Sequence, residues 1–468
     1  MPAEEDFARE RYLSTLAEPY RVKVVEKLRL PTRGERERAL AAAHFSPVFL
    51  DSADIFIDLV SDSGTAAMSD EQWSALMRAD EAYIRPRSFF RLEAAVREIL
   101  GFAQLIPTHQ GRAAEQIMME VLVRPGDVVL GNTHSDTTRA HIKHRGGIPL
   151  DLVNEALFEP KSEHPFLGNF DLDKLRAALE RHRGKVSLLI CTIVNNIAAS
   201  APVSLANMRA ASALAAEHGV RVVFDACRFA ENAHLIQTRE PGQSDKSVRA
   251  IALEMFALGS ACWMSAKKDA LVNTGGFIAV RDEALAQRCQ ELAVLYEGFF
   301  TYGGLAGRDL EAMAVGLYEG TEDEYLSHRT RLVAHLGERL SAAGMAVVKP
   351  VGGSGVYVDP RSVYPQLGPA EFPSIAFFAD LYREGGIRIA GIPAYLQNVD
   401  RASGEAVERR IELVRFAVPR RAYGKAHLDY VGDIAERVAR DGAKNRGYRM
   451  VAGAGQAGFF AKYAPVGQ

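Results

Sequence analysis

Asp225 and Lys268 are the two residues whose types and positions most directly indicate chemistry. Asp225 ends the apolar run VRVVFD, and the carboxyl end of a strand is where α/β sheets bind ligands. Lys268 lies in MSAKKDA, after an interval that leaves room for one helix and one strand. An amine for a Schiff base and a carboxylate that keeps a pyridine nitrogen protonated are what pyridoxal phosphate (PLP) requires. Taken alone, the pair is more often a pair of ordinary structural residues, because a strand-end aspartate and a distant lysine are common.

A second segment favours a phosphate site. Residues 108–112 (THQGR) precede AAEQIMMEVL, a strongly predicted helix. A glycine at a helix start exposes backbone N–H groups to a phosphate, and Arg112 adds positive charge. Ser265, three residues before Lys268, is a further candidate phosphate donor, and Arg228 lies on the turn after the aspartate.

Short apolar runs alternate with helical patterns in the middle of the chain, which is typical of βαβ units around a largely parallel sheet. The predicted buried strands are residues 127–130, 185–194, 220–225 and 276–280. A helix is predicted between two of them, with Ser204 as its N-cap and Gly219 just beyond its C-terminal end. The sequence therefore predicts a large α/β domain with a mostly parallel sheet.

A smaller α/β domain is expected after the helical pattern that follows Gly304 and continues through the stretch 322–339. It would contain VVKPVGGSGVYVD, a strand–turn–strand, and IELVRFAVPRR, a strand. At 468 residues the chain is too long for one simple core. We divide it into an N-terminal arm with part of the small domain (1–60), the large domain (61–320) and the remainder of the small domain (321–468).

Composition excludes several classes of function. Hydrophobic residues make up 48% and charged residues 25%, and the net charge of -3 leaves no excess of Lys and Arg for nucleic acid or acidic membranes. The cysteines form no CxxC pair, so we expect neither a disulfide framework nor a zinc site; they are Cys191, Cys227, Cys262 and Cys289. The N-terminal MPAEEDFARERYL lacks an apolar core, and no apolar run approaches the roughly 20 residues of a membrane span. We expect a soluble, cytoplasmic protein without nucleic-acid or membrane partners.

The chain resembles the tryptophanase and tyrosine phenol-lyase family of β-eliminating lyases over nearly its whole length. The matching blocks are FIDLVSDSGTAAMSDEQW, ADEAY, PTHQGRAAEQ, APVSLANMRA, FDACRFAENA, MSAKKDALVNTGGF, EGFFTYGGLAGRDLEAMAVGL and VRFAVPRRAY. The resemblance implies a fold-type I PLP-dependent enzyme, a carbon–carbon lyase that forms a homotetramer and acts on a small L-amino acid.

The resemblance also implies a set of cofactor residues. Lys268 would carry PLP, and Asp225 would pair with the pyridine nitrogen. Asn196 and Arg228 would hold the ring oxygen. The phosphate would be bound by Gln110, Gly111, Arg112 and Ser265.

Substrate and cation residues are implied in the same way. Arg415 would bind the substrate carboxylate with Ser63 close by, and Tyr83 would be the general acid that protonates the leaving group. A monovalent cation, K⁺, would be held by oxygens of Gly64, Glu81 and Asn273. By residue type alone, Tyr83 also suits a half-buried structural tyrosine, Ser63 a turn and Glu81 a solvated helix face.

The leaving-group pocket departs from both activities of the family. Ser135 stands where the family places an aromatic ring against PLP, unless His134 replaces that ring. Asp136 agrees with tryptophanases, and Ile392 stands where phenol-lyases carry an arginine and tryptophanases an isoleucine. Phe459 occupies the place of a histidine that tryptophanases use near indole.

Together these features predict β-elimination from an L-amino acid. The Lys268 amine would remove the α-proton, Tyr83 or a neighbour would protonate the departing β-substituent, and pyruvate and ammonia would result. Asp136 and Ile392 favour an indole-type or other aromatic leaving group. Phenol-lyase activity is the second alternative, and a divergent β-eliminating or biosynthetic enzyme, suggested by Ser135, is the third. An aminotransferase of the same fold and a catalytically silent PLP-binding protein also stay open.

Overall fold

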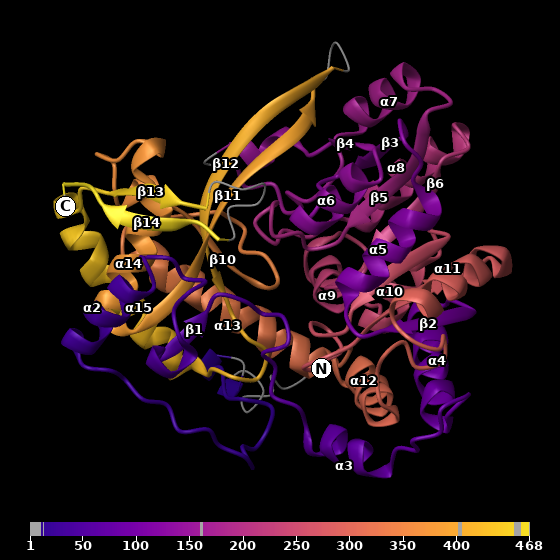
Figure 1. Cartoon of the computed structure of the whole chain (residues 1–468), viewed down its shortest axis with the longest axis horizontal. Coiled ribbons are helices and arrows are strands. Elements are labelled where there is room, and N and C mark those ends of the chain that lie inside the picture. Colours follow the sequence, from indigo (N-terminus) through magenta and orange to yellow (C-terminus); the bar gives the residue numbers. More distant parts are fainter. Residues whose placement is uncertain (1–10, 13, 160–161, 401–404, 454–459, 468) are drawn as a thin grey trace, which may run out of the picture.

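The structure is a computed structural model that describes residues 11–12, 14–159, 162–400, 405–453 and 460–467. It has two halves, which in the described part of the chain share one 12-stranded sheet through the pairing of β4 with β11, and the long helix α13 (Asp323–Ala342) runs between them (Figure 1). The middle of the chain forms one half, and segments from both ends of the chain form the other.

The sheet of the first half runs in the order β2–β8–β7–β6–β5–β3–β4. These strands are β2 Gln104–Thr108, β3 Val128–Gly131, β4 Ile148–Asp151, β5 Val186–Thr192, β6 Arg221–Asp225, β7 Ala261–Ser265 and β8 Gly276–Val280. Neighbouring strands from β7 to β4 are parallel, whereas β8 is antiparallel to both of its neighbours. The carboxyl ends of the parallel strands therefore meet at one edge, where open α/β sheets bind ligands.

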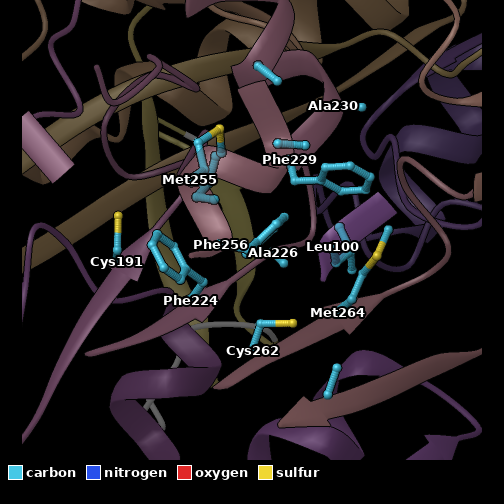
Figure 2. Packing of buried hydrophobic residues seen from close by; sticks show 14 of the residues in the cluster. Leu100, Cys191, Phe224, Ala226, Phe229, Ala230, Met255, Phe256, Cys262 and Met264 are labelled. Atoms are coloured by element: carbon cyan, nitrogen blue, oxygen red, sulfur yellow. The ribbon is translucent and has the colours of Figure 1, made fainter. Parts of the chain in front are cut away.

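Side chains of these strands alternate between two buried faces, as the period of two requires in a sheet covered on both sides. On β7, Cys262 and Met264 join one hydrophobic cluster, and Trp263 joins another. Figure 2 shows part of the first cluster, where the Phe256 ring packs edge-on against Phe224 with 5.4 Å between centroids.

Helices cover both faces of this sheet. The first face is covered by α4 Arg87–Leu100, α7 Leu172–Arg181, α8 Leu205–Glu217, α9 Phe229–Arg239, α10 Val248–Phe256 and α12 Gly307–Glu319. The second face is covered by α5 Gly111–Leu122, α6 Asp136–His144 and α11 Glu283–Tyr296. The further helix α3 (Asp70–Arg78) packs against α12.

The second half contains a mostly antiparallel sheet in the order β11–β12–β10–β9, with β1 parallel to β11. Its strands are β1 Ile57–Leu59, β9 Ala346–Val347, β10 Gly355–Asp359, β11 Ile387–Val399 and β12 Ala406–Ala417, and a separate hairpin is formed by β13 Tyr448–Ala452 and β14 Lys462–Pro465. Its helices are α2 Arg33–Ala42, α14 Pro373–Gly385 and α15 Lys425–Asp441. Among the described residues, every helix of the chain is too short or too polar to span a bilayer.

Two elements link the halves. The long β11–β12 hairpin reaches β4, where Asn398 pairs in register with Asp151 (Figure 1). Helix α13 contributes Leu326 to the core of the first half and Leu336 to that of the second. The second core also takes side chains from residues 40–59. The domain boundaries near residues 60 and 320 stay a prediction.

Local signals in the sequence correspond to observed element ends. The Ser204 hydroxyl accepts a hydrogen bond from Asn207 N and caps α8, and Gly219 adopts a left-handed φ of 65° just beyond that helix. The helical pattern after Gly304, in contrast, is divided into α12 and α13. At Gly320 a Cβ atom would lie 1.9 Å from the Asp269 carbonyl oxygen, so this close approach fixes the turn between the two helices.

Candidate active site

The predicted site residues follow the carboxyl ends of neighbouring strands. Asp225 is the last residue of β6 and pairs in register with Thr192 on β5 and Trp263 on β7. Its Oδ1 atom accepts a hydrogen bond from Cys227 N at 3.2 Å, and among the described residues no cationic side chain forms an ion pair with it. A buried carboxylate without a cationic partner suits a ligand that brings a positive charge.

The two lysines of MSAKKDA have separate partners. Lys268 Nζ lies 3.4 Å from the Ser63 hydroxyl, whereas Lys267 Nζ lies 3.3 Å from the Gln110 side-chain oxygen. Burial and the charges of Lys268 and Arg112 lower the pKa of Lys267. Lys267 therefore belongs beside the helix start at Gln110, and Lys268 faces the segment that contains Ser63.

The start of α5 fits a phosphate. Gln110 is the N-cap residue and makes no side-chain capping bond, and the first-turn N–H groups of a helix lack intrahelical acceptors. A Cβ atom on Gly111 would lie 2.5 Å from the Cβ of Ser265, so only glycine lets the helix start approach the end of β7 this closely. The predicted phosphate residues Gln110, Gly111 and Ser265 are thus brought together, with the solvent-exposed Arg112 on the first turn.

Arg228 and Asn196 contact protein partners. Arg228 donates through Nη2 and Nε to the two carboxylate oxygens of Asp62, at 2.7 and 2.8 Å, and through Nη1 to the Val194 carbonyl at 3.2 Å. The Asn196 side-chain oxygen accepts a hydrogen bond from the Tyr357 hydroxyl at 3.1 Å. Asn196 follows β5 and Arg228 follows β6 in the chain, and their role toward a ring oxygen stays a prediction.

Arg415, on β12, carries an unsatisfied donor. Its Nη2 donates to the Val60 carbonyl at 2.7 Å, while its Nε is buried without a hydrogen-bond partner. The positive charge of Arg415 contributes to lowering the pKa of the buried Asp62 and opposes the raised pKa of Asp136. A buried guanidinium N–H without an acceptor is a position that a ligand carboxylate would satisfy.

The start of α6, where Ser135 and the predicted substrate residue Asp136 lie, carries polar side chains. Ser135 caps α6 by accepting a hydrogen bond from Thr138 N at 3.2 Å, and its hydroxyl lies 2.8 Å from the Thr138 hydroxyl. Both hydroxyls bond to Glu115, which is 3% exposed. Burial, together with the negative charge of Asp225, raises the pKa of Glu115 to about 7. Ser135 therefore belongs to a hydroxyl–carboxyl cluster beside Asp225.

His134 does not present an open ring face. It is 1% exposed, and its Nδ1 lies 2.9 Å from the carboxylate of Asp151, which also pairs with Arg139. Asp136, the first residue of α6, is reached by solvent. The surrounding protein nevertheless raises its pKa, because it disfavours the charged carboxylate.

Two predicted substrate residues cannot be placed by their side chains. Ile392 lies on β11, where its backbone pairs with Leu413, and its side chain is not described. Phe459 lies outside the described residues.

Tyr83 lies on the surface. It is 66% exposed, and its ring neighbours are Tyr302 and Phe299, at centroid distances of 5.2 and 6.1 Å. A hydrogen bond with Tyr302 raises the pKa of Tyr83. Within the described part of this chain, no hydrogen bond or ring contact joins Tyr83 to Lys268.

Two of the three predicted cation ligands lie together. The Asn273 amide donates to the carbonyl oxygens of Gly64 and Ala66, both at 3.0 Å. Glu81 instead accepts a hydrogen bond from Gly307 N at 3.1 Å, at the start of α12, and its other carboxylate oxygen lies 3.5 Å from Arg308. The structure therefore joins Gly64 to Asn273 and does not bring Glu81 into contact with them.

Several site neighbours were missed by reasoning from sequence. They are buried polar residues that contact predicted site residues or flank them in the chain: Asp62, Glu115, Thr138, Asp269, Tyr357 and Arg420. Position was the available signal for two of them, because Asp62 directly precedes Ser63 and Asp269 directly follows Lys268.

Known proteins resemble the chain in sequence and in fold. A tryptophanase from Salinibacter ruber is 46% identical over 432 residues, covering 92% of each chain. A tyrosine phenol-lyase from Symbiobacterium thermophilum is 43% identical over 454 residues, covering 96% of this chain and 99% of that one. The fold also matches a threonine aldolase from Leishmania major, with a TM-score of 0.58, 14% identity and coverage of 82% and 99%. A serine palmitoyltransferase from S. paucimobilis with a bound PLP–myriocin aldimine matches with a TM-score of 0.57, 12% identity and coverage of 83% and 88%.

These structural neighbours show that the chain has the fold-type I architecture of PLP enzymes. The family model described as "Beta-eliminating lyase" matches residues 58–434, which include the segments of Ser63, Asp225, Lys268 and Arg415. From this match and from identities above 40% over almost the whole length, the chain belongs to the β-eliminating lyase family.

Proposed function

We propose that this β-eliminating lyase holds PLP on Lys268 and removes an indole-type aromatic group from an L-amino acid, giving pyruvate and ammonia. The observation that carries the proposal is that three charged side chains predicted for the site lack ion-pair partners in the described part of the chain. They are the amine of Lys268, the carboxylate of Asp225 and the guanidinium of Arg415, none of which has an ion-pair partner among the described residues.

The residues present fit PLP. The predicted phosphate site, called the cradle below, consists of Gln110, Gly111 and Ser265. A single Cβ atom on Gly111 would fill it, and its place at a helix N-terminus suits a phosphate. Asp225 would hold a proton on the ring nitrogen. When bound, the cofactor supplies a ring that accepts electrons from the substrate Cα.

Substrate orientation is the task of Arg415 and Lys268. A carboxylate bound by the Arg415 fork would satisfy its buried Nε, and the substrate would then be fixed at one end. The Lys268 amine, 3.4 Å from the Ser63 hydroxyl, is the base available to take the α-proton, and Ser63 offers it a hydrogen-bond partner.

Asp136 supports an indole-type leaving group. It is solvent-accessible at the start of α6, within electrostatic reach of Arg415, and its carboxyl oxygens can accept a hydrogen bond from an indole N–H. L-Tyrosine should be a poor substrate, because Ile392 cannot hydrogen-bond a phenol hydroxyl. A buried unpaired polar group costs on the order of 1–3 kcal/mol, or roughly tenfold to hundredfold in kcat/KM.

Measurement of kcat/KM for L-tryptophan, L-tyrosine and S-alkyl-L-cysteines tests this assignment. We expect modest activity on L-tryptophan, above that on L-tyrosine, and a further loss on L-tryptophan in the Asp136→Thr variant. L-Tyrosine as the best substrate would contradict the proposal. Formation of the pyridoxamine form with an oxo acid, in place of pyruvate and ammonia, would identify an aminotransferase.

A divergent β-eliminating enzyme with a non-aromatic substrate is the second candidate. The observation that favours it is the polar wall of Ser135, Thr138 and Glu115, where an aromatic ring would otherwise stack. Activity on S-alkyl-L-cysteines alone would support this candidate over the first.

A monovalent cation and a homotetramer complete the proposal, and we place the protein in the cytoplasm. The cation would lie near Gly64 and Asn273; Glu81, the third predicted ligand, would have to leave Gly307 and Arg308 to reach it. Tyr83, exposed on its own chain, would act as the general acid in the site of a neighbouring subunit. Activity should be higher in potassium than in sodium. Unchanged activity and an unchanged cofactor spectrum after potassium is replaced by sodium would contradict the proposed cation site.

A further inference from the structure

Arg420 is a fully buried guanidinium that binds three carboxylates. It follows β12 and is 0% exposed. Its Nη1 donates to the carbonyl and carboxylate oxygens of Asp62, at 3.1 and 3.0 Å. Its Nη2 donates to Glu231 and to Asp269, both at 2.8 Å. The Arg420 side chain, which comes from the second half of the molecule, therefore joins the three segments that contain Asp62, Glu231 and Asp269.

Two of these carboxylates flank the residues that meet in the site. Asp62 directly precedes Ser63, and Asp269 directly follows Lys268. Because consecutive Cα atoms are separated by a fixed distance of about 3.8 Å, a group that fixes Asp62 and Asp269 also limits the separation of their neighbours. Those neighbours are Ser63 and Lys268, and Lys268 Nζ lies 3.4 Å from the Ser63 hydroxyl.

A second connection closes the network through α9. The other carboxylate oxygen of Asp269 accepts hydrogen bonds from Ala230 N and Glu231 N, at 2.8 and 3.2 Å, in the first turn of that helix. Arg228, the N-cap residue of α9, binds Asp62 through two hydrogen bonds. The turn after Asp225, the lysine loop and the segment before Ser63 are thus tied to one another.

Arg420 is one of three buried guanidiniums that face three buried carboxylates in this network. The buried carboxylates of Asp62, Glu231 and Asp269 face three buried guanidiniums, those of Arg228, Arg329 and Arg420. Burial and the charge of Glu231 raise the pKa of Asp269 to about 7, while Arg420 opposes the rise. Without Arg420, the carboxyl next to Lys268 would lose its only ion-pair partner among the described residues.

We propose that Arg420 is a positioning residue of this lyase, which holds Asp62 and Asp269 so that the Ser63 hydroxyl stays against the Lys268 amine. The proposal rests on the proposed role of Lys268 as the residue that carries PLP. A network that only stabilised the junction of the two halves would change the melting temperature without changing how Lys268 binds the cofactor.

The test compares Arg420→Lys with Arg421→Lys in the full chain. Arg421 is the matched control, because it is the next residue, forms an ion pair with Glu319 at 2.7 Å and, among the described residues, makes no hydrogen bond or ion pair with Asp62 or Asp269. Lysine keeps the charge but cannot present a fork to several carboxylates, so Arg420→Lys should weaken PLP binding by about tenfold. It should also shift the pH midpoint of the bound cofactor's absorption band, and the control should change neither.

Wild-type PLP binding and wild-type pH midpoint in a folded Arg420→Lys variant would overturn the proposal, even with a lower Tm. If that variant fails to fold, Asp269→Asn supplies the same readouts, because it removes the charge that Arg420 binds and keeps the side-chain shape. An unaltered pH midpoint in Asp269→Asn likewise counts against the positioning role. Failure of the wild-type protein to bind PLP on Lys268 would instead refute the proposed function itself.

Discussion

Gly111→Ala is a small change with a large expected effect on PLP binding. The added Cβ would lie 2.5 Å from the Cβ, 2.6 Å from the Cα and 2.7 Å from the N atom of Ser265. Two of these are backbone atoms, so no side-chain rotation relieves the overlap. Since ordinary carbon contacts lie near 3.5–4.0 Å, the start of α5 and the end of β7 must separate by about 1 Å.

The magnitude follows from the cost of overpacking. An extra methyl group in a well-packed region typically costs about 1–3 kcal/mol. Phosphate binding requires the start of α5 and the end of β7 to come together again. The overpacking cost then opposes binding, and PLP affinity should fall roughly 5- to 150-fold. Any part of the cost that the cofactor-free protein already carries should lower the melting temperature instead of the affinity.

Titration of the cofactor-free protein with PLP measures this loss. Gly34→Ala is the control, because its Cβ would meet only Arg38 Nη1, at 3.5 Å, on α2 in the other half of the molecule. We expect the control to bind PLP with wild-type affinity. A Gly111→Ala variant with unchanged affinity and unchanged Tm would refute the cradle.

Asp225→Ala should bind PLP weakly and exchange the substrate α-proton slowly, because an unprotonated pyridine ring is a poor electron acceptor; normal α-deuterium exchange would show that another residue fills this role. Glu115→Gln should change how stability depends on pH. Burial and the Asp225 charge raise the pKa of Glu115 from 4.5 to about 7, so the folded protein holds this proton more tightly than the unfolded chain does, and the unfolding free energy falls as pH rises through that window. The variant lacks this loss and should gain roughly 2–3 kcal/mol relative to wild type between pH 5 and pH 8. Denaturant unfolding at both pH values measures the difference, and an equal difference at pH 5 and pH 8 would contradict the raised pKa.

Buried strands and helix caps were predictable because their signals are local. The strand predicted at 276–280 coincides with β8, and Ser204 caps α8 as expected. A strand buried on both faces is a continuous apolar run, so it stands out between polar turns. Asp225 could be placed at a ligand-binding edge because it ends a predicted strand, and open α/β sheets bind ligands at the carboxyl ends of their strands.

The strand β11 was not predicted, and its sequence explains why. Gly391 and Pro393 argue against a strand interior, because glycine is flexible and proline lacks an N–H donor. In the structure β11 pairs with β1 at 387–389 and with β4 only at Asn398. Between these points its second edge has no strand partner among the described residues, so Pro393 occupies an edge position that tolerates it.

The buried ion pairs could not be predicted either. Arg228 lies 166 residues from Asp62, and Arg420 lies 358 residues from the same carboxylate. The chain has 56 Lys and Arg and 59 Asp and Glu residues, so residue type alone does not show which acid pairs with which base. The packing of the two halves selects it, because only the folded chain places β12 next to the segment before Ser63.

The central claim is that Lys268, and not its neighbour Lys267, carries PLP. Borohydride reduction of the protein with bound PLP, followed by proteolysis and mass-spectrometric peptide mapping, tests it directly. We expect the pyridoxyl group on Lys268, whose amine faces Ser63, while Lys267 remains unmodified beside Gln110. A pyridoxyl group on Lys267, or reduced protein without any modified lysine, would contradict the claim.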